Sequence, residues 1–170
     1  RAVLRLTGLM DNTDFIKMSM DSVGQQILMP DHILCSAELY YVPDSLLGLL
    51  SLESSVGALE MSMEYCLSRQ YYSAVLSADA INLRSVFPLQ SIGVVSLQAE
   101  IDGVGWDFME PIASLDCLLW IDSLVWNGYT FYNGRFMISL YDGDLFVEGV
   151  CADTLVDFRL RTFVNYSPYH

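Results

Sequence analysis

The chain is expected to form an all-β protein organised as one domain over residues 1–170. Three observations predict this class. Apolar and polar residues alternate in several runs, which is typical of strands with one buried face. Dipeptides that favour tight turns separate some of these runs. The runs recur at intervals of about 8–12 residues, which indicates an all-β sandwich or barrel.

The alternating runs occupy residues 16–20, 59–65, 95–101 and 158–166. Asp142-Gly143 lies between residues 136–141 and 145–150, so a hairpin is expected there. Asn127-Gly128 and Asn133-Gly134 carry the same signal and predict two further turns.

Residues 43–53 interrupt the pattern because they contain several leucines and no β-branched residue. Leu46, Leu49 and Leu50 recur at helical spacing, and Asp44 or Ser45 can cap the start. A short connecting helix is therefore predicted here, and residues 79–84 are a second candidate.

The charge balance excludes some classes of function. Eight Lys and Arg residues stand against 21 Asp and Glu, and the formal net charge is −13. Only Arg159 and Arg161 lie close together, whereas phosphate recognition needs clustered cations. No apolar run reaches the roughly 18 residues that span a bilayer. With only 17% charged residues, much of the surface must be neutral, which suggests partners that cover it.

No catalytic, cofactor-binding or metal-ligating residue is predicted. The two histidines, His32 and His170, have no nucleophile motif near them, and no glycine-rich phosphate loop is present. The four cysteines form no C-x-x-C pair, which disfavours zinc and redox sites. Free thiols are favoured over the two disulfides that a secreted protein would allow.

Acidic residues leave two further possibilities open. A glycosidase needs two carboxyl groups across a cleft, and the candidates are Glu100, Glu110, Asp122 and Glu148. Asp142 and Asp144, with Glu148, are conceivable calcium ligands. Solvent-exposed acids and an ordinary turn are the favoured interpretation of both sets.

Aromatic residues are concentrated between residues 106 and 132. An exposed row of rings would stack on sugars, which supports an alternative function as a secreted, lectin-like carbohydrate-binding module. Core and subunit contacts are favoured instead. The residues expected at a subunit interface are Leu46, Trp106, Trp126, Tyr129 and Tyr132.

Three passages, taken in chain order, resemble picornavirus-like capsid proteins, especially the small coat proteins of comovirus, nepovirus and cheravirus-type plant viruses. In residues 50–63 an expected helix leads through Gly57 into an alternating strand. Residues 94–103, followed by Trp106-Asp107-Phe108, resemble the strand and loop in the middle of that domain. Residues 145–152 and 158–163 resemble its last two strands.

The resemblance implies an eight-stranded antiparallel jelly-roll sandwich with one or two short connecting helices. It implies a non-enzymatic coat subunit, cut from a polyprotein, that assembles with sister subunits in the host cytoplasm into an icosahedral virion. The expected partners are those subunits and the enclosed RNA, bound mostly without specificity, and neither a membrane nor a small-molecule substrate. Arg159 and Arg161 are the expected RNA or inter-subunit contacts.

Overall fold

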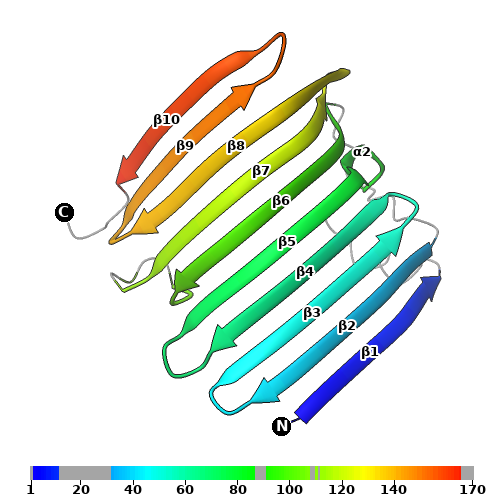
Figure 1. The fold of residues 1–170 in the computed structure, drawn as a ribbon, viewed down its shortest axis with the longest axis vertical. Helices are drawn as coiled ribbons and strands as arrows, with labels where there is room; N and C mark the ends of the chain where they lie inside the picture. Colours follow the sequence, from blue (N-terminus) through cyan, green and yellow to red (C-terminus); the bar gives the residue numbers. More distant parts are fainter. Residues whose placement is uncertain (1, 12–31, 87–90, 108–109, 111, 166–170) are drawn as a thin grey trace, which may run out of the picture.

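A computed structural model describes residues 2–11, 32–86, 91–107, 110 and 112–165. This part of the chain forms one antiparallel sheet of ten strands and one short helix (Figure 1). The helix is α2 (Leu83–Val86). The strands are β1 (Ala2–Asp11), β2 (His32–Val42), β3 (Ser45–Ser54), β4 (Gly57–Cys66), β5 (Tyr71–Asn82), β6 (Ile92–Val104), β7 (Ser114–Trp126), β8 (Tyr129–Tyr141), β9 (Asp144–Ala152) and β10 (Asp157–Asn165).

The all-β class and the antiparallel pairing predicted from the sequence are confirmed, but the eight-stranded jelly roll is not. In a jelly roll, long connections carry the chain between two sheets. Here the strand order across the sheet is β1 to β10, so every strand pairs with its neighbours in the chain. The physical reason is the length of the turns. Two residues join β2 to β3 and β3 to β4, and connections this short hold consecutive strands side by side.

The predicted turns have mixed outcomes. Asn127-Gly128 and Asp142-Gly143 both join neighbouring strands, and all four residues have positive φ, as a type I′ turn requires. These two predictions are confirmed. Asn133-Gly134 lies inside β8, so the third predicted turn is wrong, although Asn133 does adopt a positive φ of 57°.

The helix predicted over residues 43–53 is wrong, because residues 45–54 form β3. Leucines occupy both faces of this strand and thereby hide its alternation. The second candidate, residues 79–84, is largely the end of β5, and only its last two residues belong to α2. The alternating run at residues 16–20 lies outside the described residues.

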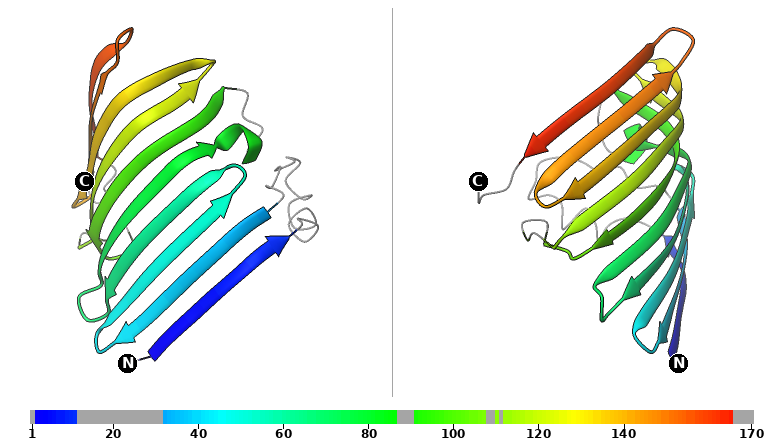
Figure 2. Two further views of the ribbon diagram at one scale, coloured as in Figure 1. Left: turned by 45° about the vertical axis from the view of Figure 1, so that its right-hand side comes forward. Right: turned by 60° about the vertical axis from the view of Figure 1, so that its left-hand side comes forward.

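The sheet is a single twisted layer, and no second sheet covers either face within the described residues (Figure 2). The accessible surface is 11690 Å². A compact protein of this mass exposes about 8,400 Å². None of the described side chains is both large and fully buried. The described part of the molecule therefore has little interior, and most of its side chains lie on the two faces of the sheet.

Candidate functional site: the apolar face of the sheet

Residues directly opposite each other in an antiparallel pair lie on the same face of a sheet, so the strand registers define each face. On one face, four rows of nine positions run from β2 to β10 without a charged residue, and we call these rows the apolar face. The first two rows are Cys35, Leu52, Leu59, Ala78, Leu97, Ile121, Gly134, Cys151, Phe158, and Ala37, Leu50, Met61, Leu76, Ala99, Leu119, Phe136, Gly149, Leu160. The other two are Leu39, Gly48, Met63, Ala74, Ile101, Cys117, Ile138, Val147, Thr162, and Tyr41, Leu46, Tyr65, Tyr72, Gly103, Leu115, Leu140, Leu145, Val164.

Hydrogen-bonding side chains are almost absent from this surface. Thr162 is the only hydroxyl-bearing aliphatic residue, and the tyrosines Tyr41, Tyr65 and Tyr72 all lie in one outer row. The most buried apolar residues of the described chain are mainly on this face, among them Ala99 and Leu140, each 6% exposed. From strand spacings, the four rows cover about 38 Å across the strands and about 20 Å along them. Most side chains of these rows are half-buried or buried, and the exposed ones lie at the two ends of the face, on β2 and β10.

Glycines on the apolar face allow aromatic rings to lie across neighbouring strands. A Cβ added at Gly149 would collide with the ring of Phe136, and one added at Gly103 would collide with the ring of Tyr72. Each ring therefore fills the space above a strand that has no side chain at that position. The result is a surface of aliphatic side chains with few projecting rings.

Two aromatic clusters border the apolar face at opposite ends of the strands. Trp106, in the connection after β6, stacks on Tyr72 with ring centroids 4.4 Å apart and tilts against Tyr65 at 5.7 Å. At the other end, the ring centroid of Phe131 lies 4.7 Å from that of Tyr129 and 6.5 Å from that of Trp126. Beside this second cluster the apolar face contains a cavity of about 160 Å³ with no polar lining atoms exposed.

The structure brings together four of the five residues predicted at an interface. Leu46 lies within the apolar face, and Trp106, Trp126 and Tyr129 belong to the aromatic clusters at its borders. Tyr132 is opposite Ser123 on the other face of the sheet and is 50% exposed. Sequence reasoning missed the apolar face as a unit, although the alternation within single strands was visible.

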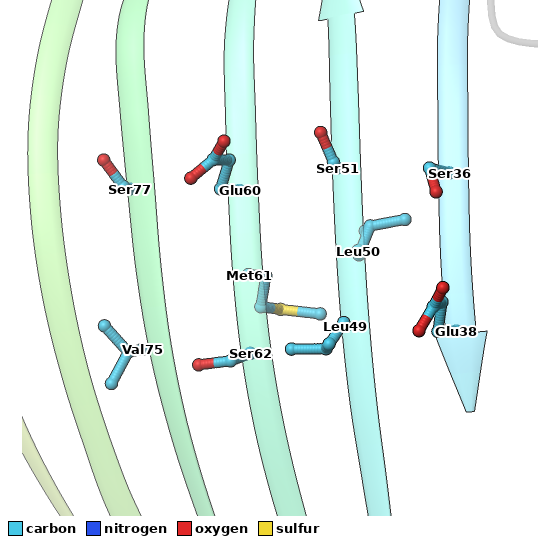
Figure 3. A pocket seen from close by; sticks show the side chains of 10 residues that line it. All are labelled: Ser36, Glu38, Leu49, Leu50, Ser51, Glu60, Met61, Ser62, Val75 and Ser77. Atoms are coloured by element: carbon cyan, nitrogen blue, oxygen red, sulfur yellow. The ribbon is translucent and has the colours of Figure 1, made fainter. Parts of the chain in front are cut away.

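The opposite face, which we call the polar face, carries the charges. Over β2 to β5 it is hollowed, and Figure 3 shows Glu38 and Glu60 in this hollow on either side of β3, with Leu49 and Ser51 of β3 between them. Tyr40 donates a hydrogen bond to Glu38. Glu38 and Glu60 lie two strands apart and two residues out of register, or about 12 Å. The hollow contains no histidine among its lining residues.

Two of the four carboxylates considered for a glycosidase, Glu100 and Glu148, do not converge. Glu100 on β6 and Glu148 on β9 share the polar face but lie three strands apart, about 14 Å. Glu148 instead accepts a hydrogen bond from Arg161 at 3.1 Å, and Asp144 accepts one from Asn165 at 2.6 Å. In the described part of the chain, no group of three His, Cys, Asp or Glu residues is arranged to hold a metal ion. All four cysteines are free.

Asp153, in the turn between β9 and β10, is a buried carboxylate that joins this turn to β8. It accepts hydrogen bonds from the backbone N–H groups of Leu155 at 3.0 Å and Tyr132 at 3.1 Å, and from the hydroxyl of Tyr129. The bond from Leu155, followed by that from Tyr129, lowers the pKa of Asp153. The carboxylate thus fixes the β9–β10 turn against the start of β8.

We expect Asp153→Asn to lower the melting temperature by several degrees at pH 7, because the new amide NH₂ cannot accept the bond from Tyr132. Because the pKa of Asp153 is lower in the folded protein, its ionised carboxylate stabilises the fold at pH values above the ordinary Asp pKa of about 3.9. This stabilisation is lost as the pH falls through the lowered pKa of the folded protein. The difference in melting temperature between the two proteins should therefore shrink from pH 7 to pH 3. An equal difference at both pH values would contradict an electrostatic origin.

Comparisons of the chain with protein-family models, with curated proteins and with solved structures found no match. Among the helices that the structure describes, none has the length and apolarity needed to cross a membrane.

Proposed function

We propose that this protein binds the hydrocarbon chains of lipids on its apolar face and has no catalytic role. The observation that supports the proposal is the lack of charge at all 36 positions of that face. An alkyl chain needs no hydrogen-bond partner, so it matches a surface that offers almost none. The aromatic clusters at the borders present rings with polar edges where a lipid would meet water.

A lipid explains this composition better than a protein partner. Protein interfaces contain about one hydrogen bond per 100–200 Å² and are anchored by Trp, Tyr and Arg residues near the centre. The apolar face has aliphatic residues and glycines at its centre, and its tyrosines lie in an outer row. Its length of about 20 Å along the strands also accommodates one acyl chain, which spans about 15 Å in half of a bilayer core.

The expected affinity follows from the methylene groups removed from water. Each buried CH₂ contributes about 0.8 kcal/mol, so a chain that buries ten of them gains about 8 kcal/mol. This corresponds to a dissociation constant on the order of 1 μM. Titration with a fluorescent stearate should therefore show saturable binding in the micromolar range.

The free cysteines supply a test with an internal control. Cys117 lies within the apolar face, where burial raises the pKa of its thiol, whereas Cys66 lies on the polar face and donates a hydrogen bond to Asp44. Bound oleate should slow alkylation of Cys117 at least fivefold and leave the rate at Cys66 unchanged. Mass spectrometry of each labelled peptide gives both rates. Equal effects on the two thiols, or no saturable stearate signal, would overturn the proposal.

A second candidate is the shell-subunit role predicted from the sequence, in which neighbouring subunits cover the apolar face. The observation that favours it is that β1 and β10 are both edge strands of the described sheet. It predicts that native material sediments as a large particle containing RNA and companion chains. A small, nucleic-acid-free species that carries lipid would favour the first candidate.

A further inference from the structure

The outer edge of β10 is unusually regular for an exposed strand. Its nine residues pair with β9 in unbroken register from Asp157 to Asn165, and all nine are exposed. Natural edge strands are commonly protected by proline, a bulge, short length or charged side chains, and of these β10 has only the charged side chains. β10 contains no proline and no bulge. Its free backbone groups can therefore accept another strand.

The two faces of β10 specify what such a strand would carry. Phe158, Leu160 and Val164 extend the apolar face, whereas Arg159 and Arg161 lie on the polar face. Arg161 pairs with Glu148 on β9, at 3.1 Å. Arg159 is opposite Val150 and forms no ion pair within the described residues, although the chain as a whole carries a net charge of −13.

We infer that the β10 edge binds an extended protein segment in which apolar residues alternate with Asp or Glu. Antiparallel pairing would place its apolar side chains beside Leu160 on the apolar face and its carboxylates beside Arg159 and Arg161. A second copy of this chain matches poorly. Pairing of β10 with another β10 would place both copies of Arg159 and Arg161 on one face with only Asp157 of each copy to balance them, and the one acid of β1 is Asp11 at its end.

The test uses two labelled nine-residue peptides, one alternating Val with Glu and the other alternating Val with Lys. Fluorescence anisotropy with the whole chain should show at least tenfold tighter binding of the Glu peptide, and 0.5 M salt should reduce that preference. Hydrogen exchange should slow at backbone amides of β10 when the Glu peptide is bound. The inference is overturned by equal affinity for the two peptides, by no binding of either, or by protection confined to other strands.

Arg159→Glu should remove the preference for the Glu peptide or reverse it. Arg69→Glu is the matched control, because Arg69 is an exposed arginine in the turn between β4 and β5, five strands from β10. It makes the same change in net charge and should alter the preference less than twofold. If the two variants behaved alike, general electrostatic attraction would account for the binding and the edge would have no part in it. This test is independent of lipid binding.

Discussion

Leu119→Asn should weaken binding of fluorescent stearate at least fivefold. Leu119 lies near the centre of the apolar face, opposite Ala99 on β6 and Phe136 on β8. A bound alkyl chain would cover the new amide without giving it a hydrogen-bond partner, and burying an unpaired amide costs about 1–3 kcal/mol. That cost corresponds to roughly a 5- to 140-fold loss of affinity.

Leu118→Asn is the matched control, because Leu118 is the preceding residue on the same strand and lies on the polar face, 40% exposed. The two substitutions are chemically identical and leave the net charge unchanged. Leu118→Asn should change the stearate affinity less than twofold. Comparable losses in both variants would show that the substitution acts through the strand, and would contradict binding on the apolar face.

Gly57→Ala should destabilise the fold by about 3 kcal/mol or more. Gly57 begins β4 with a φ of 129°, a conformation that residues with a Cβ rarely adopt. Its backbone also lies against the irregularity in β5, where the register with β6 shifts between Ala78 and Ile81. An added Cβ would stand 2.6 Å from the Cα of Ile81 and 2.8 Å from the carbonyl oxygen of Ala80. Backbone atoms must move to relieve these contacts.

Gly128→Ala provides the comparison for this prediction. Gly128 has a φ of 81° in the turn between β7 and β8, but an added Cβ there meets no atom within 4 Å. Conformational strain alone should cost about 1 kcal/mol. Urea unfolding monitored by circular dichroism measures both losses. Equal losses would mean that the close approach of Gly57 to β5 contributes nothing.

Strand positions were readable from the sequence where a single face is apolar. The alternation of Leu59, Met61, Met63 and Tyr65 with polar residues places β4 correctly, because every second side chain points to the same face. The same logic failed for β3, whose leucines lie on both faces. Leucine spacing of three and four residues then imitates a helix, and only pairing with β2 and β4 resolves the ambiguity.

The candidate site was only partly readable. Leu46, Trp106 and Trp126 were expected at an interface, and they lie in or beside the apolar face. The face as a whole depends on the register between strands as far apart in the chain as β2 and β10. A shift of one residue in any pair would move a set of apolar side chains to the other side of the sheet. Composition and periodicity contain no information about that alignment.

By itself, the sequence determined the all-β class, two of the type I′ turns and the scarcity of charge that requires covered surface, because these depend on neighbouring residues and on composition. The tertiary structure alone decided that the strands form one sequential sheet instead of a two-sheet sandwich. It also decided that the uncharged positions of nine strands coincide on one face. Both results come from cross-strand pairing, in which each strand takes its place from the backbone hydrogen bonds of its neighbours.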